Sequence, residues 1–365
     1  MSVPTRAGGD GGLPQRVVSL VAAGVSPSRV SRAVTDLREA GRPYDTADVV
    51  AHLEARVARA DGGSGAAAAL QAAGAEILVA GQPGYPARLV RAWPEQGAPL
   101  WLFSRAPQGG LPDAPSCAVV GTRHPSLDGL DTARALGAAL ARAGVVVVSG
   151  MARGIDQAAH RGALEAGGQS VAVLGTGFGV DYPQGDGSLR DEIAAAGGVV
   201  TELLPGAPPR GHHFLARNRI ISGLVDVVVV VEGRSRSGAL STAQHAAEQG
   251  REVLACPGSI NAPASRAPLD LIRDGATVLT RLEDAVEAAG ALALRQEEGR
   301  VDTAQEVSET ARRVLDLLGS TPASIDRVAR AVGCSAAGVL AAAAELSALG
   351  LASRTSKGLV RVQRP

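Results

Sequence analysis

Residue types that can bind an anion occur in short segments placed directly after apolar runs of this sequence. Gly121 and Arg123 follow the run CAVV, whereas Ser149, Gly150 and Arg153 follow the run VVVV. A glycine lets the backbone approach an anion, N–H groups at the start of a following helix point toward it, and a guanidinium group binds two phosphate oxygens. Each segment alone also fits an ordinary turn between a strand and a helix, so the prediction of an anion site depends on their combination.

A glycine-rich segment, LGTGFGVDYP, adds Gly175, Gly177 and Phe178 to the candidates. Its spacing differs from G-x-G-x-x-G, and Tyr182 with the proline after it leads away from an immediate helix. The segment therefore does not predict a dinucleotide-binding fingerprint. We interpret it as a cradle for a phosphate or for a sugar-phosphate backbone.

The segment HHFLARNRIISGL places Arg217, Asn218 and Arg219 near the start of an apolar helix. Two guanidinium groups at the positive end of a helix are unfavourable unless an anion or a carboxylate compensates them. Both explanations stay open, because Arg219 can equally form a structural ion pair with Glu202 or Glu232.

The segment GRSRSGALSTA combines two arginines with Ser237 and Gly238 at the expected start of another helix. This arrangement suits contacts to an anion. Ser237 is also a normal helix N-cap residue, so a purely local role remains open.

Aromatic residues make up only 2% of the chain, and between residues 117 and 292 they are limited to Phe178, Tyr182 and Phe214. All three are expected in loops beside glycines and arginines. Such rings can stack on unpaired bases while guanidinium groups hold phosphates. The alternative is that the rings simply cover the edge of the sheet.

Asp156 and His160 lie four residues apart on one predicted helix and could form an acid–base pair. Catalysis would also require a nucleophile and an oxyanion site, and the sequence has no G-x-S-x-G segment, no P-loop lysine and no metal-binding pair. We therefore predict that Ser149 and Gly150 line the site, whereas Asp156 and His160 support neighbouring loops.

The elements that must position these residues alternate regularly from residue 117 to residue 292. Several apolar runs are continuous and β-branched, which is typical of strands buried on both faces of a parallel sheet. The pattern predicts a doubly wound α/β fold with a parallel sheet. Ligands of such folds bind outside the carboxyl ends of the strands, where all the candidate segments fall.

Helical periodicity and composition divide the chain further. We predict a small helical module over residues 1–73 with a disordered start, the α/β domain over residues 74–292 and a linker over residues 293–305. Three helices and a short strand pair over residues 306–365 predict a winged-helix domain.

The last predicted helix of that domain, SAAGVLAAAAELSALG, contains no basic residue, so it is a poor reader of DNA bases. Arg354, Lys357, Arg361 and Arg364 follow it on the predicted wing. A role in contacting phosphates and a role in contacting proteins or in regulation both remain open for the wing.

Composition excludes several classes of protein. Apolar residues make up 45% of the chain, which indicates well-buried cores, and the zero net charge excludes a chain-wide polycation. The three cysteines are isolated, which argues against disulfides and a zinc site and suits the reducing cytoplasm. No apolar run approaches the roughly 20 residues that span a bilayer, so we expect a soluble protein with no membrane partner and no cofactor.

Six segments, VGTR, SGMARGIDQAAH, LGTGFGVDYP, FLARNRIISGL, VVVVEGRSRSGALSTA and CPGSI, resemble the DNA-processing protein A family, also called DprA or Smf. The resemblance covers roughly residues 76 to 285. It implies an extended Rossmann-like domain that binds single-stranded DNA, forms homodimers and loads RecA recombinase in natural transformation. It also implies DNA contacts for Arg123, for the glycines at 175 and 177, and for the Arg217-Asn218-Arg219 turn.

The resemblance further implies a SAM-like nature for the N-terminal module. The segment SRAPLDLIRDGA departs from the family pattern at Ala267 and Leu269, so we assign no site to that loop. These two positions lie outside the segments that carry the arginines and glycines of the predicted site.

We therefore expect a non-catalytic single-stranded DNA-binding protein. The alternative is an enzyme of the nucleotide phosphoribohydrolase type acting on nucleoside monophosphates, with Glu232 beside the GRSRSGALST loop. Release of free base from a nucleoside monophosphate would favour the alternative.

Overall fold

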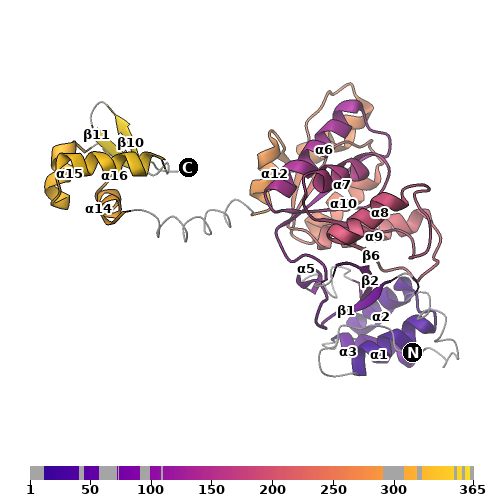
Figure 1. Ribbon diagram of the computed structural model, residues 1–365. Coiled ribbons are helices and arrows are strands. Elements are labelled where there is room, and N and C mark those ends of the chain that lie inside the picture. The colour runs from indigo at the N-terminus through magenta and orange to yellow at the C-terminus, as the bar shows by residue number, and fades with distance from the viewer. Residues whose placement is uncertain are drawn as a thin grey trace. The chain divides into compact units, whose positions relative to one another are not determined.

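The computed structural model describes residues 12–40, 45–56, 72, 74–90, 99–107, 110–290, 308–318, 323–348, 352–355 and 358–361 (Figure 1). The chain divides into two units, Met1–Leu292 and Ala293–Pro365. The predicted disordered start and the predicted linker lie outside the described residues.

The first unit is built on a nine-stranded sheet with the order β1-β2-β6-β5-β4-β3-β7-β8-β9. From β6 to β9 all neighbouring strands are parallel, whereas β2 pairs antiparallel with both β1 and β6. The strands are β1 (Glu76–Val79), β2 (Trp101–Arg105), β3 (Ser116–Val120), β4 (Val146–Ser149), β5 (Ser170–Val173), β6 (Gly198–Thr201), β7 (Val227–Val230), β8 (Glu252–Ala255) and β9 (Thr277–Val278). The predicted doubly wound parallel sheet is confirmed.

Helices cover both faces of this sheet (Figure 1). Successive residues of β3 alternate between two cores: Cys117 and Val119 lie on one face, and Ala118 and Val120 on the other. Because both faces are buried, a strand of consecutive apolar residues is more stable here than an alternating one. The helices are α5 (Ala87–Val90), α6 (Leu127–Arg142), α7 (Ile155–Glu165), α8 (Gly187–Ala196), α9 (Gly211–Gly223), α10 (Gly238–Glu248), η1 (Pro263–Ser265), α11 (Arg266–Arg273) and α12 (Leu282–Ala288).

The chain leaves β3 toward β4, β5 and β6 on one side and returns to β7 on the other side of β3. The connections after β3 and β7 therefore diverge from each other. A crevice for a ligand forms at such a switch point, outside the carboxyl ends of the two strands.

The N-terminal part of the first unit contains α1 (Gly12–Ala22), α2 (Pro27–Glu39) and α3 (Thr46–Glu54). Their apolar faces share one core with β1 and β2, including Val17 and Val49 from the helices and Trp101 and Phe103 from β2. The predicted helical module is thus present and packs on the antiparallel end of the sheet (Figure 1).

The second unit contains α14 (Glu309–Leu317), α15 (Ile325–Val332), α16 (Ala336–Ala348) and the hairpin of β10 (Ala352–Thr355) with β11 (Gly358–Arg361). A bridge between Ala323 and Leu359 adds a third short segment to the hairpin. The predicted winged helix is confirmed. Lys357 and Arg364 of the predicted wing lie outside the described residues.

Over the described part of the chain, no single helix is long and apolar enough to cross a bilayer. One bent pair, Ile325–Val332 with Ala336–Ser347, passes by length and composition only. Its buried residues, such as Val328 and Leu346, pack in the core of the winged helix.

Candidate nucleic-acid interface

A groove of about 800 Å³ lies at the switch point between β3 and β7. We call it the carboxyl-edge groove. Its lining residues come from the loop after β3, from the N-terminal half of α9 and from the loop that leads into α10. They include Gly121, Arg123, Phe214, Leu215, Arg234 and Arg236.

Three arginines of this groove, Arg123, Arg234 and Arg236, are exposed to solvent. No carboxylate of the described residues lies within ion-pair distance of any of them. The one acidic side chain that lines the groove, Asp156, is buried at its base. The groove therefore carries positive charge that the described part of the protein does not neutralise, and this charge attracts anions.

Aromatic rings form one wall. The Phe214 ring lies 5.2 Å from the Tyr182 ring, centroid to centroid, and the guanidinium carbon of Arg123 lies 5.1 Å from the centre of Phe214. Gly175 makes this placement possible, because a Cβ at position 175 would overlap the Phe214 ring. The half-buried Phe214 ring is thus held beside a cation at the surface, an arrangement suited to stacking against a base.

Arg217 lies below the groove, with only 7% of the residue exposed. Its Nη1 donates hydrogen bonds to the carbonyl oxygen of Gly150, at 2.8 Å, and to that of Val173. These carbonyls belong to the ends of β4 and β5, so Arg217 ties two neighbouring strands to α9. Burial lowers the pKa of Arg217 to about 10, and the nearby Asp156 carboxylate opposes that shift.

The Asp156 carboxylate accepts the backbone N–H groups of Gly150, at 3.1 Å, and Ala152, at 3.3 Å. Desolvation raises the pKa of Asp156, whereas Arg217 and these N–H groups counteract the rise. The carboxylate thus fixes the loop after β4 in place.

His160 is fully buried, and its Nδ1 lies 2.7 Å from the Ser170 hydroxyl, which itself donates to the carbonyl of Val147. Burial lowers the pKa of His160 to about 3. A neutral imidazole in this place supports β4 and β5. Asp156 and His160 therefore have separate partners, as expected for residues that support loops.

Four further predicted site residues lie beneath the surface. The Ser149 hydroxyl donates to the carbonyl of Val119 at 2.6 Å, and Phe178 is 6% exposed and belongs to the core next to β5. Gly150 and Gly177 are buried, and side chains there would overlap Arg217 and the Leu204 carbonyl, respectively. In this structure these residues shape the edge of the sheet from below and expose little surface.

Arg219 and Arg153 lie away from the groove lining. Arg219 pairs with Glu202, at 2.6 Å between Nη2 and Oε2, which is one of the two partners that the sequence left open. Arg153 is exposed, donates to the carbonyl of Gln184 and lies 3.7 Å from Asp186.

The start of α10 faces the groove. Gly238 is exposed there, the first turn of α10 has no acidic residue, and Ser237 at the N-cap makes no side-chain capping bond. The Oγ of Ser237 is buried with no hydrogen-bond partner among the described residues. Asn218 links α9 to this turn, since its side-chain amide donates to the carbonyl of Gly238 at 3.0 Å.

The groove thus brings together seven of the predicted residues: Gly121, Arg123, Phe214, Arg217, Asn218, Ser237 and Gly238. The groove also contains Tyr182, Arg234 and Arg236, which the sequence analysis noted among the loop aromatics and in the GRSRSGALSTA segment without assigning them DNA contacts. The predicted site also omitted Leu215, which is 53% exposed and offers an apolar surface beside Phe214.

Glu232, the residue on which the enzymatic alternative depends, is not among the groove-lining residues. Its carboxylate accepts the backbone N–H of Ser126 at 2.9 Å and the Ser126 hydroxyl at 2.6 Å. Because Ser126 is the N-cap of α6, Glu232 stabilises the start of that helix. Within the described residues, no cluster of three or more His, Cys, Asp and Glu side chains could hold a metal ion.

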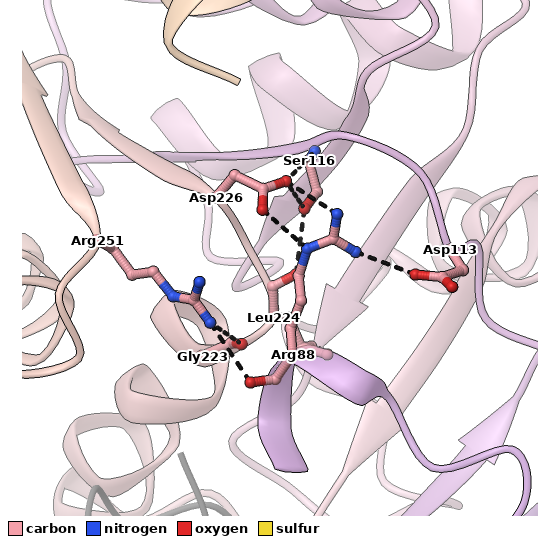
Figure 2. A network of polar contacts seen from close by, with 7 residues as sticks. All are labelled: Arg88, Asp113, Ser116, Gly223, Leu224, Asp226 and Arg251. Atoms are coloured by element: carbon pink, nitrogen blue, oxygen red, sulfur yellow. Dashed lines mark hydrogen bonds and ion pairs between the residues drawn. The ribbon is translucent and has the colours of Figure 1, made fainter. Parts of the chain in front are cut away.

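A second polar network lies at the opposite, amino ends of the strands, and we call it the amino-edge network (Figure 2). Arg88 of α5 donates through Nε and Nη2 to both oxygens of Asp226, each at 3.0 Å, and through Nη1 to Asp113 at 3.3 Å. Asp226 also accepts the backbone N–H and the hydroxyl of Ser116 at the start of β3. Arg251 donates to the carbonyls of Gly223 and Arg88.

Comparison with known proteins identifies two matching family models. The model "DNA recombination-mediator protein A" matches residues 76–290, and the model "DprA winged helix domain" matches residues 298–355. The DNA processing protein DprA of Mycobacterium tuberculosis is 43% identical over 266 residues, which cover 72% of this chain and 68% of that protein.

Two solved structures of DNA processing protein A are similar to this chain. DNA processing protein A from Streptococcus pneumoniae has a TM-score of 0.61 and 32% identity, covering 74% of this chain and 96% of that one. DNA processing protein A from Helicobacter pylori, a structure concerned with that protein's single-stranded DNA binding mode, has a TM-score of 0.52 and 25% identity, covering 61% of this chain and 96% of that one.

Proposed function

This chain belongs to the DNA recombination-mediator protein A family, and on that premise we propose that it binds single-stranded DNA in the carboxyl-edge groove without catalysing a reaction. Membership of the family gives the chain a role in DNA processing. Binding of a single strand is the specific form of that role that the groove supports best.

One observation carries the proposal: Arg123, Arg234 and Arg236 surround a groove whose wall is the Phe214–Tyr182 ring pair. Guanidinium groups bind successive phosphates, whereas an exposed ring stacks on a base only when that base is unpaired. In a duplex the bases are stacked on each other, so the rings would contribute nothing. The combination therefore favours a single strand over a duplex. The Helicobacter pylori relative, described for its single-stranded DNA binding mode, lends further support.

Binding of fluorescent oligothymidine and of a duplex of equal length, each at two salt concentrations, tests this function. We expect the single strand to bind more tightly, with an affinity that falls as salt rises because counterions are released. Arg123→Glu should lower the affinity for the single strand by about 10-fold or more, since it replaces an attraction to phosphate by a repulsion. Equal binding of the variant and the wild type would contradict the assignment of the groove.

We further propose that the bound protein is a homodimer and loads RecA recombinase onto the strand, as the family resemblance implies. Light scattering during size-exclusion chromatography measures the mass of the assembly. RecA assembly on strands coated with single-strand binding protein tests loading: we expect faster assembly with the wild type and no acceleration with Arg123→Glu.

The absence of catalysis is tested with nucleoside monophosphates. We expect no release of free base, because the Glu232 carboxylate is engaged by Ser126 at the start of α6. Base release that disappears in Glu232→Gln would support a phosphoribohydrolase instead.

A further inference from the structure

A second cavity, of about 330 Å³, lies between α2 of the helical module and α9. Residues from the start of α2 line one side, and residues from α9 and from the segments after β5 and β6 line the rest. The polar and charged lining residues are Ser26, Ser28, Ser31, Glu202, His212, His213, Arg217 and Arg219. The groove and this α2–α9 cavity lie on two sides of α9 and share one residue, Arg217.

Two guanidinium groups of this cavity keep donors without partners. Arg217 is 7% exposed, and its Nε has no hydrogen-bond partner among the described residues. The Nη1 of Arg219 is likewise buried and unpartnered, although its Nη2 pairs with Glu202, whose carboxylate also lines the cavity. A buried donor left unpaired is unfavourable, because it has lost its hydrogen bonds to water. Such donors therefore favour binding of an acceptor group in the cavity.

The starts of both helices favour an anion as that acceptor. Neither α2 nor α9, each of 13 residues, has an acidic residue in its first turn, and Ser26 at the N-cap of α2 makes no side-chain capping bond. The first N–H groups of a helix and its dipole attract negative charge. Arg29 and Arg32 of α2 are exposed, and no carboxylate in the described part of the chain pairs with either.

We propose that the α2–α9 cavity binds a backbone phosphate of the same single strand that occupies the carboxyl-edge groove. The strand would cross the first turn of α9, at His212 and His213, between the two sites. Because Arg217 lines both sites, a strand bound in the groove is the simplest source of a phosphate for the cavity. The inference therefore rests on the proposed function. Its consequence is that the helical module takes part in binding DNA.

The test compares oligothymidines of about 4 and about 16 nucleotides, the two ends of the usual range of site sizes. Ser28→Glu/Ser31→Glu places two carboxylates on exposed positions of α2 that line the cavity. We expect this variant to bind the short strand like the wild type and the long strand about 10-fold more weakly. Its salt dependence for the long strand should fall by about 0.7 per lost phosphate contact.

Ser19→Glu is the matched control, because Ser19 is an exposed serine of α1 outside the cavity lining. It should bind both strands like the wild type. Ser28→Arg gives the opposite change at the same position and should strengthen binding of the long strand only, which keeps the test valid if the double variant does not fold.

Wild-type affinity of a folded Ser28→Glu/Ser31→Glu variant for the long strand, or no gain with Ser28→Arg, would overturn the inference while leaving the groove intact. A wild-type protein that binds neither strand would overturn the proposed function together with the inference.

Discussion

At the amino ends of the strands, Arg88 lies between the carboxylates of Asp226 and Asp113 (Figure 2). At the carboxyl ends, in contrast, Arg123 lines the groove with no described carboxylate in ion-pair distance. Arg88 lies between β1 and β2, and Arg123 follows β3 of the same sheet. Their surroundings differ because Asp226 occupies the turn before β7, and the corresponding loop after β7 carries Arg234 and Arg236 instead.

This difference separates an arginine that stabilises the fold from one that is free to bind a ligand. In the amino-edge network the charge of Arg88 is compensated by Asp226 and Asp113 within the protein, so removing Arg88 leaves Asp226 without its ion-pair partner. In the carboxyl-edge groove the compensating charge must come from outside, so removal should leave the fold unchanged and weaken binding of an anion. The predictions below follow that contrast.

The largest effect on stability should come from Arg217. It lies at the carboxyl edge, but its guanidinium group, like that of Arg88, is hydrogen-bonded within the protein. Arg217→Met leaves the Gly150 and Val173 carbonyls without their donor and the buried Asp156 carboxylate without its cation. We expect the free energy of unfolding to fall by about 3–5 kcal/mol. Urea unfolding followed by circular dichroism measures it.

Arg153→Met is the matched control at the same edge, because Arg153 is exposed and its ion-pair distance to Asp186 is 3.7 Å. Its effect on stability should stay within about 0.5 kcal/mol. If Arg217→Met changed the free energy of unfolding equally little, Arg217 would not hold the ends of β4 and β5 together.

Arg88→Met should affect stability next most strongly. The change removes three charge-assisted hydrogen bonds to Asp226 and Asp113, and we expect a loss of about 1.5–3 kcal/mol. Affinity for oligothymidine should stay at the wild-type value, as measured by fluorescence anisotropy. Weakened DNA binding at full stability would reverse the roles assigned to the two edges.

The sequence predicted the general architecture well, because buried strands and amphipathic helices leave patterns in neighbouring residues. The regular alternation expected from residue 117 to residue 292 is present as the strands and helices from β3 to α12. The edge at which the glycine- and arginine-rich segments meet was also predictable, since it follows from the direction of parallel strands.

The depth of individual side chains was not predictable in the same way. Arg217 and Arg219 are two residues apart on α9, so they point in directions about 200° apart. One is buried against strand ends and the other pairs with Glu202. Which direction faces the groove depends on the rotation of α9 on the sheet. That rotation is fixed by the packing of Ile220 and Ile221 in one core with residues of other elements, such as Val228 of β7.

The pH dependence of stability should depend on the buried His160 and not on the exposed arginines of the groove. His160 has a pKa of about 3 in the folded protein and about 6.5 when unfolded, so only the unfolded chain binds a proton between these values. The stability that this difference provides is complete above the unfolded pKa and is lost as the pH falls. From pH 7 to pH 5 we expect a loss of about 2 kcal/mol.

His160→Gln, which cannot titrate, should lack this part of the pH dependence. Asp156, whose pKa is raised, contributes with the opposite sign at lower pH in both proteins, so the difference between their unfolding curves isolates His160. Parallel curves for the two proteins would mean that folding does not lower the pKa of His160.

The smallest effect should come from Arg234→Gln/Arg236→Gln, which neutralises two exposed groove residues and changes no described ion pair. Each arginine that contacts one phosphate of a single strand contributes about 0.7 to the slope of log affinity against log salt. The double variant should therefore reduce the slope by about 1.4 and the affinity by about 10-fold, while urea unfolding stays at the wild-type midpoint. A lower slope with unchanged stability would show that charge left unpaired by the fold is what binds the strand, whereas a loss of stability would place these arginines with Arg88.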